Sequence, residues 1–304
     1  MELLRPRTIA EATAALRDGA VALAGGTEVV PLLRDGPLLA ARLVPLAGVV
    51  PRGVDGRRAT PEAEQSHEVG AAAATAAPRP VLRVGAGTTL AELEVDPEIP
   101  AALREACRLA ASPQLRSMGT LGGNLLQATR CWYWRLHSGC WLQGGDRCHA
   151  REGEHREHAF FGNGRCASAH PSDPAAALLA LGATLRTDRR ELPLSELYRL
   201  PRDDDRSTTT LAADELLLEL EVPSPDASVY LKAMDRKRFA FALVGVAAAR
   251  SGGEVRIALA GAAPIPWLLA APDALDEATP LPGTSYKVEV ARTLVDRALE
   301  AVAP

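Results

Sequence analysis

Apolar positions in the first third of the chain follow the period of a helix in one segment and form continuous runs typical of short buried strands in others. Residues 8–17 (TIAEATAALR) have helical spacing, with Thr8 at the N-cap and Glu11 three residues later, the spacing of a capping box. A strand, a double-glycine turn and a second helix follow in VALAGGTEVVPLLRDG, and RLVPL at 42–46 predicts another strand. The Pro-, Gly- and Ala-rich residues 48–80 predict a surface loop.

The alternation of strands and helices continues to the end of the chain. From residue 80 a strand meets a Gly-Ala-Gly turn, Thr88 or Thr89 caps a short helix, and another helix covers about 100–111. Beyond a cysteine-containing region, DPAAALLALG predicts a helix that Gly182 ends. ELLLELEVP predicts a strand, SVYLKAMDRKRFAFALVGVAAAR a strand followed by a helix-like run and a hairpin, and KVEVARTLVDRALEAV a terminal helix. The class is therefore α+β, and PSPD at 223–226 marks a domain boundary.

Composition is that of an ordinary globular chain of 304 residues, with 47% hydrophobic and 24% charged residues. This length predicts two or three domains. No apolar run approaches the roughly 20 residues needed to span a bilayer, so we expect no membrane partner. The net charge of -4 and the scattered arginines give no electrostatic case for nucleic acid. The first residues lack the pattern of a secretory signal, which predicts a cytoplasmic protein.

Two glycine-rich turns stand between apolar segments: AGGTE at Ala24–Glu28 and TLGGN at Thr120–Asn124. Glycine lets the backbone approach a ligand closely, and successive N–H groups in such a turn form a concave site suited to a diphosphate. Taken alone, each turn is more often a tight strand-to-helix connection without a ligand. Neither has the spacing of a Walker loop or of the G-x-G-x-x-G fingerprint, which disfavours a P-loop or Rossmann site.

Four of the five cysteines, five of the six histidines and three of the four tryptophans lie between residues 131 and 170. The four cysteines are Cys131, Cys140, Cys148 and Cys166. Thiolate is the soft ligand that iron–sulfur clusters and zinc select, and four thiolates are the full set for a 4Fe–4S cluster. Without a C-x-x-C pair, spacing leaves a cluster, unligated thiols, or zinc with a mixed set drawn from His149, His155 or His158 all open. Cys107, on a predicted helix, is expected to be a small core residue.

Five collinear motifs resemble the FAD-binding subunit, also called the medium subunit, of the molybdenum hydroxylases. They are LAGGTEVVPLLRDG, LRVGAGTTLAEL, RSMGTLGGNL, HPSDPAAALLALGATL and YLKAMDRKRFAFALVGVAAA, and together they span nearly the whole chain. The resemblance implies an FAD-binding domain of the vanillyl-alcohol-oxidase (PCMH) type, made of two α+β subdomains, over residues 1–223. It also implies a smaller α+β C-terminal domain over residues 224–304.

The resemblance assigns an FAD site residue by residue. The cradle for the FAD diphosphate comprises Ala24, Gly25, Gly26, Thr27 and Glu28 in the first turn, and Thr120, Gly122, Gly123 and Asn124 in the second. Asp173 stands where the family has an aspartate that reaches the sugar-like part of the flavin, and Lys232 matches a lysine that faces the ring system. A cation there would stabilise the anionic reduced flavin, and a solvated lysine at a strand end is the alternative. No residue is assigned a catalytic role on an organic substrate.

An insertion over about residues 128–169 separates TLGGNL from SDPAAALLALGA and holds the clustered cysteines. Two branches of the family carry such an insertion and bind a 4Fe–4S cluster in it: the aldehyde oxidoreductases and the 4-hydroxybenzoyl-CoA reductases. The resemblance therefore implies that the four thiolates ligate a cluster, and the 9-residue step from Cys131 to Cys140 is closer to the aldehyde branch. The aromatic residues expected to pack around the cluster are Trp132, Tyr133, Trp134 and Trp141.

The function that the resemblance implies is electron transfer within a heterotrimeric molybdenum hydroxylase, which can itself dimerise. Electrons would leave a molybdopterin-binding large subunit, cross the two 2Fe–2S clusters of a small subunit, and reach FAD in this chain before they pass to an external acceptor. The favoured interpretation is the aldehyde oxidoreductase subunit. One alternative is the corresponding subunit of a 4-hydroxybenzoyl-CoA reductase, with electrons running the other way. Another, from a different class, is a zinc-stabilised binding protein without catalysis. A signal-bearing partner would carry the assembly to the periplasm.

Overall fold

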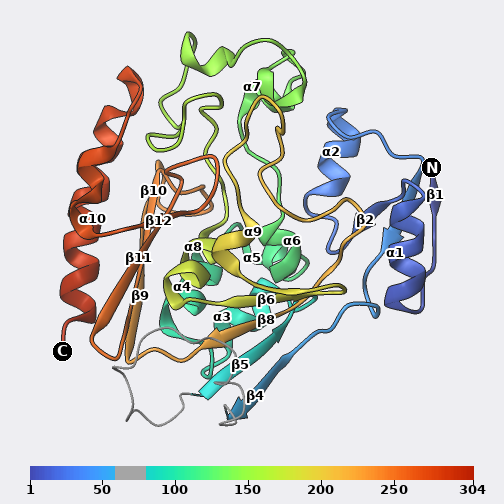
Figure 1. Ribbon diagram of the computed structural model, residues 1–304, viewed down its shortest axis with the longest axis horizontal. Helices are drawn as coiled ribbons and strands as arrows, with labels where there is room; N and C mark the ends of the chain where they lie inside the picture. Colours follow the sequence, from blue (N-terminus) through green and yellow to red (C-terminus); the bar gives the residue numbers. More distant parts are fainter. Residues whose placement is uncertain (59–79) are drawn as a thin grey trace.

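The computed structural model describes residues 1–58 and 80–304, which form three β-sheets with helices between and around them (Figure 1). The first sheet is parallel, in the order β1 (Glu2–Leu3), β3 (Arg42–Pro45) and β2 (Val21–Leu23). Its helices are α1 (Ile9–Arg17) and α2 (Val29–Asp35). One of the two hydrogen bonds of the capping box predicted for α1 is present: the Thr8 hydroxyl accepts from the N–H of Glu11 at 3.1 Å. The Glu11 carboxylate reaches back one residue further, to the N–H of Arg7.

The second sheet is antiparallel and lies in the lower part of Figure 1. Its order is β4 (Val54–Arg58), β5 (Pro80–Gly85), β8 (Leu217–Pro223), β6 (Thr184–Thr187) and β7 (Glu191–Pro193). We call this sheet and the helices that accompany it the central body. Its helices are α3 (Leu90–Val95), α4 (Ala101–Leu109), α5 (Pro113–Arg116), α6 (Leu121–Leu125), α8 (Asp173–Leu181) and α9 (Leu194–Leu197). Every residue of α8 is buried, since the helix lies against both α4 and the third sheet.

The third sheet is antiparallel, in the order β12 (Trp267–Leu269), β11 (Glu254–Ala260), β10 (Val244–Ser251) and β9 (Ala227–Ala233). The long helix α10 (Ser285–Val302) packs against β9 and β10 (Figure 1). Helix α4 contacts the same two strands, and α8 contacts β10 and β11. Alternate residues of β10 enter two different cores, because side chains of a strand point to opposite faces. Val244 and Val246 join the core that includes α10, whereas Ala247 and Ala249 join the core of the central body.

The cysteine insertion, residues 128–169, is an irregular segment at the top of Figure 1. Its short helices are α7 (Trp132–Arg135) and the 3-10 turns η2 (Trp141–Gln143) and η3 (His149–Arg151); two more, η4 (Pro272–Glu277) and η5 (Pro282–Thr284), precede α10. Lys287 of α10 ties the insertion to the third sheet. Its buried Nζ donates to the carbonyls of Glu157 (3.2 Å), His158 (2.8 Å) and Gly261 (2.7 Å). Burial lowers the pKa of Lys287 to about 7.

Two expectations from the sequence are wrong. The run DRKRFAFAL forms no helix, because residues 234–243 are a loop between β9 and β10. Within it, Phe239 has a left-handed φ of 55° and is 49% exposed, so the loop neither continues a helical turn nor buries this ring. The predicted loop over 48–80 contains a strand, β4, paired with β5. The rest of that prediction, residues 59–79, lies outside the described part of the chain.

Candidate functional site

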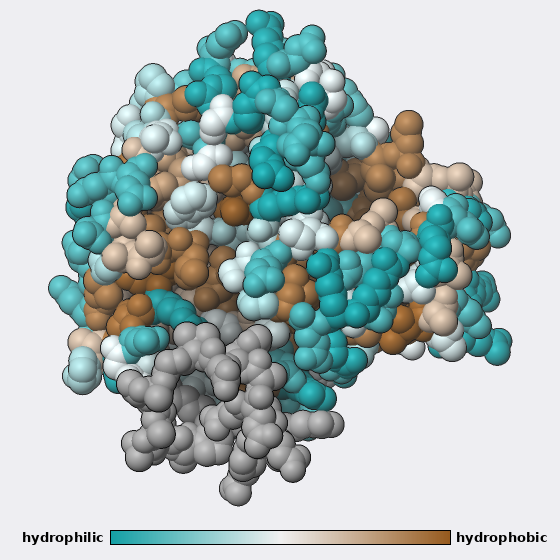
Figure 2. Space-filling model, viewed as in Figure 1, coloured by the Kyte–Doolittle hydropathy of each residue, from teal (hydrophilic) through white to brown (hydrophobic). Residues whose placement is uncertain are grey.

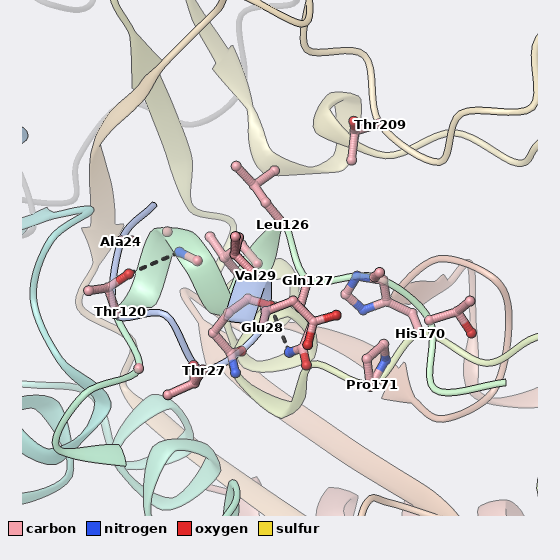
Figure 3. Close-up of a pocket in the computed structure, with 18 of the residues that line it drawn as sticks. Ala24, Thr27, Glu28, Val29, Thr120, Leu126, Gln127, His170, Pro171 and Thr209 are labelled. Carbon is pink, nitrogen blue, oxygen red and sulfur yellow. Dashed lines mark hydrogen bonds between the residues drawn. The ribbon is translucent and has the colours of Figure 1, made fainter. Parts of the chain in front are cut away.

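A cavity of about 900 Å³ is lined by the β2–α2 turn, α6, the start of α8 and the end of β9. All eleven residues that the motifs assign to FAD lie on its walls: Ala24, Gly25, Gly26, Thr27, Glu28, Thr120, Gly122, Gly123, Asn124, Asp173 and Lys232. Figure 3 labels four of them, Ala24, Thr27, Glu28 and Thr120, among the residues that line the cavity. The cavity is also lined by residues that were not assigned to FAD, such as Gln127, His170 and Thr209 (Figure 3).

The first glycine turn packs against the chain as well as facing the cavity. A Cβ at Gly25 would lie 1.7 Å from the carbonyl oxygen of Met118, so contact between the two turns requires glycine here. Gly26 has a φ of 73°, in the left-handed region that favours glycine. Among the described residues, no acceptor takes a hydrogen bond from the N–H groups of Gly25, Gly26 or Thr27. These three N–H groups are therefore able to bind phosphate oxygens.

The second glycine turn begins α6. Thr120 caps this helix, with its Oγ1 accepting from the N–H of Gly123 at 3.1 Å (Figure 3). A Cβ at Gly122 would lie 2.9 Å from the Cβ of Ala86, so this glycine fits α6 against the turn that follows β5. The double glycines of both turns are thus explained partly by close packing of the chain on itself.

The start of α8 supplies a polar wall. Ser172 caps the helix, and its Oγ donates to Asn124 Oδ1 at 2.6 Å. The Asp173 carboxylate accepts from Tyr230 Oη at 2.5 Å and from Lys232 Nζ at 2.7 Å. Burial raises the pKa of Asp173, whereas the Lys232 ammonium and the two hydrogen bonds act in the opposite direction. Lys232 is not a solvated strand-end lysine, since its side chain is 1% exposed.

Glu28 joins the first turn to the cysteine insertion. Its two carboxylate oxygens pair with Arg135 at 2.6 Å and with Arg130 at 2.7 Å. Arg130 also lies over the ring of Phe241, 5.0 Å from its centre. Burial lowers the pKa of Arg130, and Glu28 opposes that effect. Because these arginines stand on either side of Cys131 in sequence, the position of Glu28 depends on the insertion, a pairing that no motif predicts.

All four clustered cysteines line a second, narrow cavity of about 10 Å³: Cys131, Cys140, Cys148 and Cys166. Tyr133, Trp134 and Trp141 also line it. Trp132 packs edge-on against His158 instead, with ring centres 5.1 Å apart. Cys107 lies in the core of the central body, as predicted, and burial raises the pKa of its thiol.

Backbone N–H groups point at three of the four thiols. They belong to Tyr133 and Trp134 for Cys131, to Leu142 and Gln143 for Cys140, and to Ser168 for Cys166. Burial nevertheless raises the pKa of Cys131 to about 11 and that of Cys166 to about 12. N–H groups directed at sulfur stabilise the thiolate, which is the form that binds a metal, whereas burial opposes it.

Among the described residues, no three His, Cys, Asp or Glu side chains form a group that could hold a metal ion. The three histidines considered for zinc differ in their contacts. The Nε2 of His155 accepts from the N–H of Gly283 at 3.0 Å, and its Nδ1 is bonded to backbone carbonyls. The Nε2 of His158 lies 3.3 Å from Cys131 Sγ. His149 lines the cysteine cavity.

The two cavities share a wall. Thr129, Trp134, Leu142 and Ser168 line both of them. Arg206, on the wall of the larger cavity, lies over the Trp141 ring 5.0 Å from its centre and donates to the carbonyl of Gly145 at 3.0 Å. The larger and the smaller cavity are therefore neighbours, separated by single side chains.

The central part of the chain matches a known protein family. Residues 78–225 match the family described as the FAD binding domain in molybdopterin dehydrogenase. This segment covers the second glycine turn, the cysteine insertion and the start of α8. This part of the chain is therefore similar to the FAD-binding domain of the molybdopterin dehydrogenases, in agreement with the resemblance of its motifs.

Individual proteins extend the likeness to both ends. The aldehyde oxidoreductase FAD-binding subunit PaoB of Escherichia coli (strain K12) is 38% identical over 207 residues, which are 64% of this chain and 65% of that protein, slightly less than two thirds of its length. A carbon monoxide dehydrogenase from Hydrogenophaga pseudoflava superposes with a TM-score of 0.67 at 23% identity, covering 99% of this chain and 96% of that one. Quinoline 2-oxidoreductase from Pseudomonas putida 86 gives 0.59 at 19%, covering 99% and 95%. These structures confirm the predicted α+β fold.

Proposed function

We propose that the chain is the FAD- and 4Fe–4S-containing electron-transfer subunit of a molybdenum-dependent aldehyde oxidoreductase. The observation that carries the proposal is the pairing of two cavities, one lined by every residue assigned to FAD and the other by all four clustered cysteines. FAD and an iron–sulfur cluster supply the redox chemistry when bound. The chain itself binds and orients these groups and shields them from water.

The walls of the larger cavity fit FAD. Its volume of about 900 Å³ is in the range of cofactor sites. The N–H groups of Gly25, Gly26 and Thr27, which have no acceptor in the described part of the chain, suit the diphosphate, which carries negative charge. Asp173 and Lys232, also on the walls, supply an acceptor and a cation, which the resemblance assigns to the sugar-like part and the ring system of the flavin.

The chemistry of the cysteine cavity supports a cluster through its four thiols, which are the full ligand set of a 4Fe–4S cluster. In a 4Fe–4S cluster the four thiolates surround a larger unit, and here four thiols surround one cavity with N–H groups directed at three of them. A cavity of about 10 Å³ has room for about one water molecule, so the thiols must move apart when a cluster binds.

The aldehyde assignment and the partners follow from the likeness to the aldehyde oxidoreductase subunit. We propose a molybdopterin-binding large subunit and a 2Fe–2S small subunit as partners. Apolar side chains are exposed at and beyond α2 (Figure 2), with Val30 54% and Leu39 90% exposed, as expected of a surface that a partner covers. In the described residues no helix is both long and apolar enough to cross a bilayer.

Purification of the full chain under anaerobic conditions tests the cofactor content. We expect a yellow-brown protein with flavin absorbance, one releasable FAD and about four irons per chain. A colourless protein that holds one zinc ion would contradict the proposal and favour a zinc-stabilised binding protein. In the assembled enzyme, aldehyde oxidation with an artificial acceptor, in place of reduction of an aromatic thioester, distinguishes the aldehyde branch from the reductase branch.

Replacement of Cys166 by Ala tests the cluster assignment separately. The variant should lose the iron and the EPR signal of the reduced cluster but keep FAD, because Cys166 lines the cysteine cavity and is absent from the larger one. Cys107→Ala is the matched control, since Cys107 is an equally buried cysteine in the core. Full iron content in Cys166→Ala would rule out this thiol as a ligand.

A further inference from the structure

Tyr230 stands directly behind the ion pair on the wall of the larger cavity. The ring lies on β9 and is 2% exposed, and its hydroxyl donates to Asp173 Oδ1 at 2.5 Å. The other oxygen of the same carboxylate accepts from Lys232 Nζ at 2.7 Å. Asp173 and Lys232 line the cavity, whereas Tyr230 does not, so the tyrosine can reach a ligand only through the pair.

The neighbouring strand leaves space for the tyrosine hydroxyl. A Cβ at Gly245, on β10, would lie 2.1 Å from Tyr230 Oη and 2.9 Å from Cζ. Gly245 pairs with Lys232 in the β9–β10 register. The glycine therefore lies beside both Tyr230 and Lys232 in the sheet. The glycine therefore accommodates the hydroxyl and the ring carbon that carries it, and the hydroxyl makes the closer approach.

The charges of the network are almost completely removed from water. The side chains of Lys232 and Asp173 are 1% and 3% exposed. Lys232 Nζ donates to Asp173 and to the carbonyl of Leu109 at 3.0 Å, which uses two of the three protons of the ammonium group. Because the pair is buried, small shifts in the position of its charges change the field in the cavity more than they would at an exposed site.

We infer that Tyr230 is a positioning residue for the flavin: its hydroxyl shares the negative charge of Asp173 and so leaves more of the Lys232 charge to act in the cavity. The inference rests on the proposed FAD site and names a residue beyond it. Without the hydroxyl, the carboxylate has one hydrogen-bond donor fewer and interacts more strongly with Lys232. The positive potential in the cavity then falls, which disfavours the reduced, anionic form of a bound flavin relative to the oxidised form.

The test is Tyr230→Phe in the full chain, with the midpoint potential of the bound flavin as the readout. We expect FAD to be retained and its midpoint potential to become more negative. The ratio of the affinities for oxidised and reduced flavin should change by about tenfold. This change corresponds to the lower end of the free energy lost with a hydrogen bond to a charged group. Tyr198→Phe is the matched control. Tyr198 is also buried and donates one hydrogen bond, to the carbonyl of Leu125 at 3.1 Å, and it has no contact with the pair.

A second variant keeps the role distinct from packing. In an Asp173→Asn background, Tyr230→Phe should cause no further change in potential, because the hydroxyl acts through the carboxylate. The same potential in Tyr230→Phe, Tyr198→Phe and the wild type would overturn the inference while the proposed FAD site stands. A wild-type chain that binds no FAD would overturn both. Loss of FAD from both tyrosine variants alike would reduce Tyr230 to a packing residue.

Discussion

The hydrogen bonds of His170 fix the protonation state of its ring. The N–H of Ser172 donates to Nδ1 at 3.3 Å, so Nδ1 carries no proton. The ring packs edge-on against Tyr198, with centres 5.2 Å apart, on the wall of the larger cavity. Burial lowers the pKa of His170 to about 3. The folded protein therefore holds a neutral imidazole at this position at neutral pH.

This pKa predicts a loss of stability in acid. The folded pKa lies below the ordinary value of 6.5, so the stabilisation from neutral His170 is complete above pH 6.5 and is lost as the pH falls toward 3. Between pH 6.5 and 3, the unfolding free energy of His170→Gln should therefore fall less steeply with decreasing pH than that of the wild type, by about 1.4 kcal/mol per pH unit. Urea unfolding at pH 7.5 and at pH 5.5 measures the difference. The exposed His137→Gln is the control, and an equal slope in all three proteins would contradict the prediction.

At the scale of elements, local signals predicted the helices well. Thr8 caps α1, Thr89 caps α3, and Gly182 ends α8 with a left-handed φ, as predicted; the cap of α8 by Ser172 was not predicted. The sequence did not predict the loop over residues 234–243, because its spacing of apolar residues suits a helix, whereas Phe239 has a left-handed φ that interrupts a helical turn. β4 lacks a strand pattern, since VDGRR is mostly polar and depends on pairing with β5.

The site was predictable where motifs hold it and unpredictable where it depends on distant contacts. The glycine turns and the cysteines have short-range patterns in the sequence. The pairs of Glu28 with Arg135 and of Tyr230 with Asp173 join residues 107 and 57 positions apart, and no local pattern records them. Lys287 is similar: the helical period of α10 does not indicate a buried lysine, because only three carbonyls from other segments make that burial favourable.

Helix α8 gives the prediction at this scale. Leu178 is fully buried between the central helices and the third sheet, and Leu178→Ala removes packing on all sides. We expect a loss of about 2–5 kcal/mol in unfolding free energy, the range for a buried leucine. Leu268→Ala on β12 is the control: Leu268 is 43% exposed, so the change should stay near about 0.5 kcal/mol. Equal effects from the two substitutions would show that α8 is not the centre of the core.

At the scale of the whole molecule, the division near residue 223 separates sheets but does not separate cores. Tyr230, Ala247 and Ala258, which follow the boundary, belong to the same hydrophobic core as Leu178 and α4. Asp173 and its partner Lys232 also lie on opposite sides of the boundary. The predicted domains 1–223 and 224–304 therefore complete each other's interior.

Expression of residues 1–223 alone tests this dependence. The fragment should be aggregated or lack a cooperative unfolding transition, because it exposes one side of α8 and leaves Asp173 buried without its cation. Co-expression with residues 224–304 is the control and should restore a compact complex. Gel filtration and near-ultraviolet circular dichroism distinguish the outcomes. A compact, FAD-binding fragment would show that the first 223 residues fold on their own.

The position of Lys287 near the end of the chain also sets an order of events during synthesis. All four clustered cysteines leave the ribosome well before this lysine does. Until Lys287 arrives, the carbonyls of Glu157 and His158 lack their cation, and His158, which contacts Cys131, is not held in place. The insertion therefore completes its contacts with the rest of the protein only after the C-terminal helix has been synthesised and has docked.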